Sequence, residues 1–551
     1  MNQTNDAEME QDVPVLIAGG GPVGMTLALE LAHHGVKSLV VERNQSTTQH
    51  PKMDITNGRS MELFRRLGLI EQMRAVGVPQ DHPFDVMWAT RATGHLLHKF
   101  DIPSANQARA EARAKNDGAQ TSEPYMRISQ VILEPVLRAA IERSPLIAMR
   151  NGWGFDSLVQ DDSGVVAKIR QTDGGVTQTL RCAYVAGCDG GGSTVRKQLG
   201  IKLEGNASAG RVYMVHFRSK ARDVLQPWGV AWHLQTTGGN MIAQDDNDIY
   251  TLHIGVPPGT DEAKIDPRQV VTEFIGRDFD FEVLLANPWT LRELLATSYR
   301  SGRVFLAGDA AHQVIPVGGY GMNTGVGDAI DLGWKLAAVV DGWGGPRLLN
   351  SYEAERRSIA IRNRAASQRH WALRLQIMAL YAQAASNGID LDSPAAKERR
   401  ERLGRNIAAL GNVENASWGI EHGYRYDDSP VIAREAGTAP ALDPLGVRPS
   451  TWPGSRLPHF FLADGSSIHD QLGKEFTLLC VGSPAPESIQ RAAKELKIPL
   501  TVKSLAPEPR TSQYLETKYV LVRPDQHVAW RGQQVPDDAS SILKSAVGLA
   551  S

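Results

Sequence analysis

The most constraining feature of this chain lies at residues 13–24, which read VPVLIAGGGPVG. An apolar segment runs directly into glycines at positions 19, 21 and 24, and a helical pattern opens at Pro22 and Val23. We expect Gly19 to permit a tight turn, Gly21 to let the backbone approach a phosphate because it has no Cβ, and Gly24 to let helix and strand pack closely. The helix N-terminus offers free N–H groups and a positive dipole end, so the segment predicts a dinucleotide pyrophosphate site.

The residues after this turn strengthen the prediction. The helical run MTLALELAHHG ends at Gly35, and residues 37–41 predict a short buried strand that leads to Glu42. Glu42 lies 23 residues after Gly19, where a carboxylate accepts hydrogen bonds from ribose hydroxyls and repels a 2′-phosphate. The complete strand–helix–strand unit therefore predicts binding of an adenosine dinucleotide.

Composition limits the class of protein. A chain of 551 residues is too long to form a single hydrophobic core. Its 59 basic and 61 acidic residues nearly balance, so the composition does not indicate binding of nucleic acid. The first twelve residues are acidic and polar, and no run approaches the roughly 20 apolar residues that cross a bilayer. We expect a cytoplasmic protein without a membrane segment. The three cysteines form neither a disulfide framework nor a metal-ligand pattern, so we predict packed thiols and no metal site.

The order of patterns predicts an α/β fold in several parts. These are residues 1–200, the first part of a nucleotide-binding domain; 201–298, a β-rich substrate domain; 299–440, the second part with a helical segment; and 456–551, a separate α/β module. Residues 57–77 and 127–144 have helical spacing, and a Pro- and Gly-rich linker is expected at 437–458. Residues 81–123 are less regular, and we expect a surface excursion or mobile loop within them.

Two further motifs specify the nucleotide. Residues 185–196 read VAGCDGGGSTVR, and residues 302–336 read GRVFLAGDAAHQVIPVGGYGMNTGVGDAIDLGWKL; in each a strand ends at an aspartate and a glycine-rich turn enters a helix. With these motifs and the tail VLVRPDQHVAWRG at 520–532, nearly the whole chain resembles the single-component (class A) FAD-dependent aromatic hydroxylases. The resemblance is to the phenol hydroxylase-like group with a thioredoxin-like C-terminal domain.

This resemblance implies a Rossmann-like FAD-binding domain with an inserted β-rich substrate domain, and it assigns cofactor-binding roles. The implied contacts are Gly19, Gly21, Pro22, Val23 and Gly24 at the pyrophosphate; Glu42 and Arg43 at the adenosine; Arg127, Gln130 and Asp309 at the phosphate and ribityl chain; Pro316, Gly321, Met322 and Asn323 at the flavin ring; and Asp189, shared between FAD and NAD(P)H.

Several of these residues have a second interpretation. Asp189 and Asp309 would equally well cap the helices that follow them, and Arg127 would be a solvated charge at a helix start. Lys52 stands where many members of the group carry arginine, and lysine lacks arginine's bidentate fork, so a phosphate contact there stays open. His312 is expected to be a structural histidine.

Three residues are candidates for contact with the substrate. Tyr320 occupies a position in GGYG where glutamine is frequent in the group, and the alternative is a packed loop aromatic. Tyr213 and His233 lie in the β-rich insert and would assist ionisation of a phenol, and the alternative is sheet packing.

The resemblance implies an enzyme that uses NADH or NADPH and dioxygen to hydroxylate a small phenolic or polycyclic aromatic substrate through a flavin C4a hydroperoxide. The same fold would also serve an epoxidase, a Baeyer–Villiger-type oxygenase or a modifier of polyketides and antibiotics. An alternative from another class is a flavin-binding protein without turnover. The choice of NADH or NADPH, the substrate and the oligomeric state, with a homo-oligomer as one alternative, stay open at this point.

Overall fold

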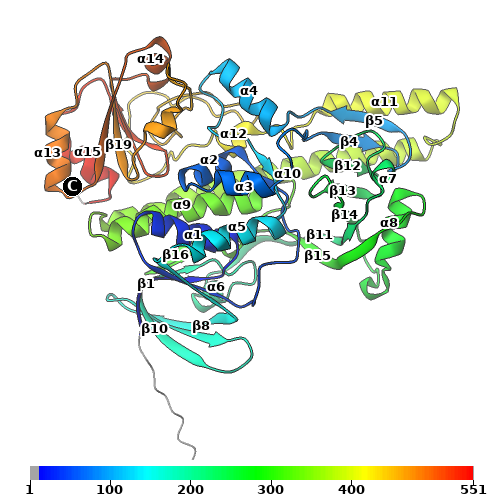
Figure 1. Cartoon of the computed structure of the whole chain (residues 1–551), viewed down its shortest axis with the longest axis horizontal. Coiled ribbons are helices and arrows are strands. Elements are labelled where there is room, and N and C mark those ends of the chain that lie inside the picture. Colours follow the sequence, from blue (N-terminus) through cyan, green and yellow to red (C-terminus); the bar gives the residue numbers. More distant parts are fainter. Residues whose placement is uncertain (1–10, 550–551) are drawn as a thin grey trace, which may run out of the picture.

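The computed structural model describes residues 11–549, which form two large sheets and a smaller four-stranded sheet near the C-terminus (Figure 1). The predicted mixed α/β fold is confirmed. The acidic residues 1–10 lie outside the described part of the chain. Among the helices of residues 11–549, none combines the length and the apolar character that a bilayer crossing needs.

The first sheet contains the predicted strand–helix–strand unit. Its strand order is β16-β17-β10-β1-β2-β7, and β1 (Gln11–Ala18) pairs in parallel with both β2 (Ser38–Glu42) and β10 (Thr177–Gly187). Its other members are β7 (Ile147–Asn151), β8 (Trp153–Gln160), β9 (Val165–Gln171), β16 (Arg300–Ser301) and β17 (Val304–Leu306). Because β1 has a partner on each side and helices cover it, its residues 15–18 are almost fully buried.

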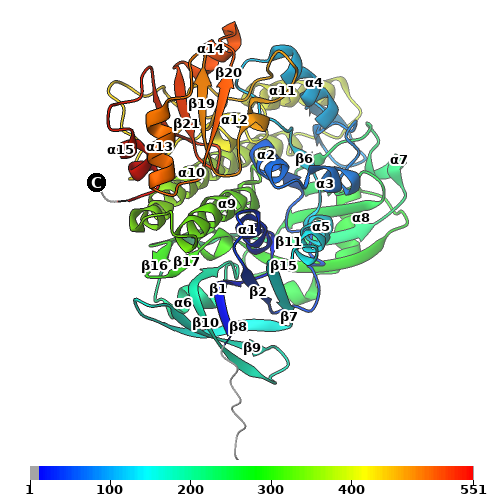
Figure 2. The same ribbon diagram turned by 60° about the vertical axis from the view of Figure 1, so that its left-hand side comes forward.

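Helices cover this sheet around α1 (Pro22–His33). Figure 2 shows α1 between α5 (Gln130–Glu142) and α9 (Tyr320–Val340), and α1 contacts both. The 40-residue helix α10 (Pro346–Ala385) packs on α9 and also reaches α11 (Pro394–Leu410). The predicted helix at 57–77 is present as α2 (Gly58–Arg66) and α3 (Ile70–Val76). Helix α5 begins later than predicted, because β6 (Met126–Arg127) pairs with β3 (Ile55–Thr56).

The second sheet carries the predicted β-rich insert, but it is larger than residues 201–298. Its strand order is β18-β15-β11-β14-β13-β12-β4-β5. The strands are β4 (Val86–Ala89), β5 (Leu96–Phe100), β11 (Leu203–Arg218), β12 (His233–Thr236), β13 (Gly239–Ala243), β14 (Ile249–Gly255), β15 (Glu282–Ala296) and β18 (His312–Gln313). Strand β4 comes from the segment expected to be irregular and pairs in parallel with β12, so that expectation was wrong there.

The segment 81–123 also contains helix α4 (Ala105–Lys115). Its N-cap Ser104 accepts from the Gln107 amide, and the Gln107 side chain accepts from the Ser104 amide, which forms a capping box. Only Ala105 of this helix is buried, so the predicted surface position is right while the predicted loop is a helix.

One face of the second sheet carries its own hydrophobic core. Tyr213, Val215 and Phe217 of β11 point into this core, and α8 (Pro267–Ile275) and α7 (Arg222–Leu225) pack against it. Because side chains alternate along a strand, the neighbouring residues Val212 and Met214 face the opposite side. That opposite face is a wall of the cavity described below.

The C-terminal module has a sheet of order β20-β19-β21-β22, in which β19 and β20 are parallel and the other pairs antiparallel. Its elements are β19 (Phe476–Val481), α13 (Glu487–Glu495), β20 (Leu500–Leu505), α14 (Pro509–Leu515), β21 (Tyr519–Val522), β22 (Val528–Gly532) and α15 (Ala539–Ala546). Cys480 is fully buried on β19, and Cys182 and Cys188 are buried too, as expected for packed thiols. Trp334 and Trp343 of the first domain share the module's core, so the module is joined to that domain.

A buried ionic network also joins the module to the first domain. Arg523 of the module donates to Glu355 at 2.7 and 2.8 Å and to Asp331 at 2.9 Å, and Lys335 donates to both of these carboxylates. The Arg523, Lys335 and Glu355 side chains have no exposed surface. The remaining short elements are α6 (Thr194–Gln198), η1 (Glu262–Lys264), η2 (Gly308–Ala310), α12 (Trp418–Glu421) and η3 (Ile468–Gln471).

Candidate active site

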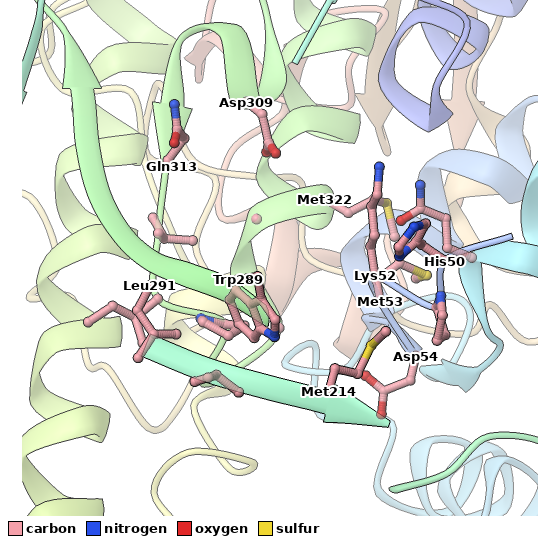
Figure 3. A pocket seen from close by; sticks show the side chains of 18 of the residues that line it. His50, Lys52, Met53, Asp54, Met214, Trp289, Leu291, Asp309, Gln313 and Met322 are labelled. Carbon is pink, nitrogen blue, oxygen red and sulfur yellow. The ribbon is translucent and has the colours of Figure 1, made fainter. Parts of the chain in front are cut away.

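A single large cavity of about 1660 Å³ extends from the β1–α1 turn to the free face of the second sheet. Figure 3 shows part of its wall, with Asp309 and Met322 on one side and Met214, Trp289 and Leu291 on the strands opposite. Sites for a single small ligand typically measure about 300–1,000 Å³. This cavity therefore has room for a large cofactor and a second molecule beside it.

The three glycines of the first turn differ in what surrounds them. A Cβ on Gly19, whose φ is +107°, would lie 2.3 Å from the Cys188 carbonyl oxygen, and a Cβ on Gly24 would lie 2.0 Å from the Gly19 carbonyl oxygen. A Cβ on Gly21 would meet no protein atom within 4 Å, and Gly21 lines the cavity. Gly19 and Gly24 thus serve the close packing of strand and helix, while Gly21 keeps a stretch of backbone bare toward the cavity.

Helix α1 points its N-terminus at this bare stretch. Gly21 is the N-cap, no side chain caps the helix, and Pro22 occupies the first turn. Pro22 and Val23 line the cavity beside Gly21. The positive end of the helix dipole therefore faces the cavity, and no side chain of the described residues caps it.

Glu42 lies at the end of β2 beside this turn and lines the cavity with Arg43. Its carboxylate accepts from the Gly20 amide at 2.7 Å, from the Asn44 amide at 2.9 Å and from the Asn44 side chain at 2.7 Å. A carboxylate offers about four acceptor positions, so one is left for a ligand hydroxyl.

Asp309 follows β17 and faces the same cavity (Figure 3). Its side chain is open to the cavity but deep within the protein, and this burial raises the pKa of Asp309 above its ordinary value. His312, three residues later, is 1% exposed and its Nε2 lies 2.8 Å from Asp328 Oδ2, which confirms the expectation of a structural histidine.

The loop before α9 brings a second helix N-terminus to the cavity. Gly318 and Gly319 both have positive φ values, +84° and +66°, and no side chain caps α9. Pro316, Gly321 and Met322 line the cavity, whereas Asn323 does not. The Asn323 side chain accepts from the Asn57 amide at 3.0 Å and donates to Gly319 O at 2.7 Å, so it holds the loop in place.

Two expected cofactor contacts are engaged elsewhere. Arg127 does not line the cavity; its guanidinium donates to Asp246 Oδ2 at 2.5 Å and Oδ1 at 2.7 Å and is 1% exposed. Asp189 lines the cavity, but its Oδ2 accepts from the Thr194 and Val195 amides, which is the helix-capping alternative. Gln130 does line the cavity and donates to Glu134 at 2.7 Å.

Two of the three residues expected to contact the substrate do not line the cavity. Tyr213 points into the hydrophobic core on the other face of the second sheet. Tyr320 is 2% exposed, does not line the cavity, and its hydroxyl lies 2.9 Å from His370 Nε2. His233 alone of the three faces the cavity, and neither of its ring nitrogens has a hydrogen-bond partner among the described residues.

Aromatic side chains surround the part of the cavity beyond the α9 loop, which we call the aromatic chamber. They are Phe84, Trp88, Tyr125, Trp232, Trp289, Trp371 and Trp418. The rings of Tyr125 and Trp418 stack, with centroids 5.4 Å apart and an interplanar angle of 18°. These flat apolar walls suit an aromatic ligand.

Asp54 is a polar group of the chamber that the sequence did not point to. Its Oδ2 accepts from Trp232 Nε1 at 2.6 Å and lies 3.5 Å from His233 Nε2. Burial alone would raise the pKa of Asp54, but the interactions with His233 and Trp232 outweigh it and lower this pKa below its ordinary value. The chamber thus contains an ionised carboxylate beside an imidazole.

Glu421 lines the same chamber in the opposite protonation state, because burial raises its pKa from 4.5 to about 8. A carboxyl whose folded pKa is raised contributes stability that is present at low pH and is lost as the pH rises toward about 8. We therefore expect Glu421→Gln to gain thermal stability over the wild type progressively between about pH 5 and pH 8. Melting temperatures of both proteins across that range test this, and a pH-independent difference would contradict it.

These features together define a flavoprotein of the dinucleotide-binding class. The residues fit FAD: a bare glycine for the pyrophosphate, two uncapped helix N-termini, a ribose-side carboxylate, and Asp309 opposite an aromatic chamber.

Comparisons with known proteins agree. Residues 12–367 match the family model described as FAD binding domain, and residues 450–550 match the aromatic-ring hydroxylase C-terminal domain. The FAD-dependent monooxygenase apdD of Emericella nidulans is 36% identical over 98% of this chain and 90% of its own length. The 4-methyl-5-nitrocatechol 5-monooxygenase of Burkholderia sp. is 32% identical over 97% of both chains. The rebeccamycin biosynthetic enzyme RebC with reduced flavin superimposes with a TM-score of 0.87 at 35% identity, covering 98% of this chain and all of that one.

The chain belongs to the FAD-dependent aromatic-ring hydroxylase family. It is an FAD-dependent monooxygenase, as the three glycine-bearing motifs predicted, with NAD(P)H as the electron donor typical of the family.

Proposed function

We propose that this enzyme hydroxylates a phenolic ring held in the aromatic chamber. The observation that supports the proposal is the continuity of the cavity, which joins the bare backbone at Gly21 to the tryptophan-lined chamber without an intervening wall. A ring placed there lies next to the α9 loop, which the family places along the flavin.

The proposed FAD contacts follow from the cavity lining. They are Gly19, Gly21, Pro22, Val23, Glu42, Arg43, Gln130, Asp309, Pro316, Gly321 and Met322. Gly24 and Asn323 support this site through backbone packing and through the hydrogen bonds that hold the loop.

FAD, when bound, supplies the transfer of electrons from NAD(P)H to dioxygen. The protein contributes a chamber that excludes water, holds the ring and removes its hydroxyl proton. We assign the last role to the pair of His233 and Asp54, in which the His233 imidazole accepts the phenol proton and the Asp54 carboxylate stabilises the imidazolium that forms. The phenolate ring left behind is the better nucleophile.

An Asp54→Asn variant tests this assignment. We expect it to retain FAD and to oxidise NAD(P)H, but to hydroxylate substrate about 10²- to 10⁴-fold more slowly, because the carboxylate that stabilises the protonated His233 is lost. The fraction of oxidised NAD(P)H that yields hydrogen peroxide should rise as the fraction that yields hydroxylated product falls. The control is Asp161→Asn, which changes an exposed turn carboxylate outside the cavity. Unchanged coupling of NAD(P)H oxidation to hydroxylation in Asp54→Asn would remove Asp54 from this role.

The activity itself is tested with purified holoenzyme and a panel of simple phenols, hydroxylated benzoates and fused-ring phenols. Consumption of NADH and NADPH, peroxide release and incorporation of oxygen-18 would be measured together. Incorporation of one labelled oxygen as a ring hydroxyl supports the proposal. Epoxide or lactone products indicate the epoxidase or Baeyer–Villiger alternative, and no substrate-stimulated oxidation of either nucleotide contradicts turnover.

A further inference from the structure

The chamber wall formed by the second sheet carries a row of five uncharged side chains, four of which are polar. The strand registers place Gln235 opposite Asn240, Asn240 opposite His253, His253 opposite Met214, and Met214 opposite Asn287. Five neighbouring strands thus contribute one residue each to a single line across the sheet, and all five residues line the cavity.

Strand geometry explains why this row faces the cavity. The sequence neighbours Leu234, Met241, Tyr213, Leu252 and Ala286 all belong to, or pack against, the hydrophobic core on the other face. Because alternate residues point to opposite faces, the burial of these neighbours forces the row toward the chamber. The register between β11 and β15 is regular from Gly210 to His216, so no bulge interrupts the row at Met214.

The row contains hydrogen-bonding groups that carry no charge. Burial lowers the pKa of His253 to about 4, so the ring is neutral near pH 7. The side-chain oxygens of Asn240 and Asn287 are buried and accept no hydrogen bond from any described residue. Such atoms are costly to leave unpaired, so these two amides are groups of the row with hydrogen-bonding capacity left for a ligand.

Three charged groups that line the cavity have partners. Arg374 and Glu414 form a bidentate pair with two contacts of 2.7 Å, and Asp54 accepts from Trp232. A ligand carboxylate lying along the row would meet amides and a neutral imidazole, and none of the five described residues of the row carries a positive charge, whereas Lys52 and Arg292 line the cavity outside the row. Arg292 is exposed and lies next to Leu291, at the edge of the cavity.

The row is also long. Neighbouring strands lie about 4.8 Å apart, so four spacings span roughly 19 Å. We propose that Gln235, Asn240, His253 and Asn287 form a row that determines specificity. These side chains form hydrogen bonds with hydroxyl and carbonyl oxygens along one edge of an elongated, uncharged, fused-ring substrate. This inference rests on the proposed hydroxylase function and adds which residues select the substrate and by what chemistry.

Binding of three probes to the holoenzyme tests the proposal: a dihydroxylated anthraquinone, the parent anthraquinone without hydroxyls, and an anthraquinone carboxylate. Dissociation constants come from the perturbation of the flavin absorbance. We expect the dihydroxylated probe to bind most tightly. Asn240→Leu and Asn287→Leu keep side-chain size and should each weaken it about 2- to 10-fold, the range of one neutral hydrogen bond, while the parent quinone changes less than twofold.

The control is Met241→Leu, which changes a residue on the core face directly beside Asn240. It should leave all three constants unchanged. If Asn240→Leu loses its flavin, Asn287→Leu decides. Equal weakening of the hydroxylated and parent probes, tightest binding of the carboxylate, or no binding of any probe would overturn the inference.

The outcome also separates this inference from the proposed function. Selective binding that depends on the row without any hydroxylation would support the row and contradict the function. Hydroxylation of simple phenols, together with equal binding of the hydroxylated and parent quinones, would support the proposed function and contradict the role of the row.

Discussion

A Gly21→Val variant is expected to purify as a folded protein without flavin. The Gly21 backbone has φ −75° and ψ −177°, which any residue adopts, and a Cβ there meets no protein atom within 4 Å. The valine side chain would instead occupy the space in which a pyrophosphate approaches the backbone. We expect loss of the yellow colour and of NAD(P)H oxidation, with far-ultraviolet circular dichroism like that of wild-type apoprotein.

The neighbouring glycines provide a matched contrast. Gly19→Ala and Gly24→Ala place a Cβ within 2.3 and 2.0 Å of backbone oxygens, so both should damage folding rather than flavin binding alone. Soluble yield and melting temperature would show this difference. A Gly21→Val protein that retains stoichiometric FAD would contradict the assignment of Gly21 to the pyrophosphate.

An Arg523→Met variant is expected to lose about 3–5 kcal/mol of stability, because it leaves buried carboxylates without their main partner. Arg523 is the cation shared by Glu355, Asp331 and Asp525, and all four side chains are at most 3% exposed. The loss would be measured as a fall in melting temperature. Arg523→Lys retains the charge but not the planar fork, so it should lie between wild type and Arg523→Met.

Lys115→Met is the control for this second prediction. Lys115 pairs with Glu111 on the surface of α4, and both side chains are at least half exposed. Exposed pairs of this kind contribute less than about 1 kcal/mol. A melting temperature of Arg523→Met as high as that of Lys115→Met would show that the network does not hold the C-terminal module to α9 and α10.

Local patterns predicted the first sheet and the cofactor well. The glycine spacing at 19–24, the apolar run at 13–18 and the acid at 42 depend on neighbours in the chain, and the structure has β1, α1 and β2 where these patterns placed them. Residues 456–551 were predicted as a separate α/β module, and the strands at 476–481 and 519–522 are mostly apolar runs of the kind typical of buried strands.

Contacts between distant segments could not be read in the same way. The partner of Arg127 is Asp246, which lies 119 residues away in the chain, and the sequence around either residue does not predict the pair. The role of Asp54 depends on Trp232 and His233, and 178 residues separate Asp54 from Trp232 in the chain.

Tyr213 shows a third limit. The sequence placed it in a β-rich segment, and it lies on β11, but the face that its side chain occupies depends on which side of the sheet α8 covers. A shift of one residue exchanges the two faces. Met214, not Tyr213, therefore looks into the chamber.

Strands β4 and β5 belong to the same sheet as β12, and this pairing matters for the construction of chimeric enzymes. Residues 86–100 and residues 203–296 build one sheet, although the nucleotide-binding segment around α5, β7 and β10 separates them in the chain. A chimera that takes only residues 203–296 from a relative would pair the relative's β12 with the β4 of this chain. To transfer substrate selectivity between members of this family, both segments should therefore be exchanged together. Libraries that exchange only one of the two segments would mostly contain proteins whose β4 and β12 do not match.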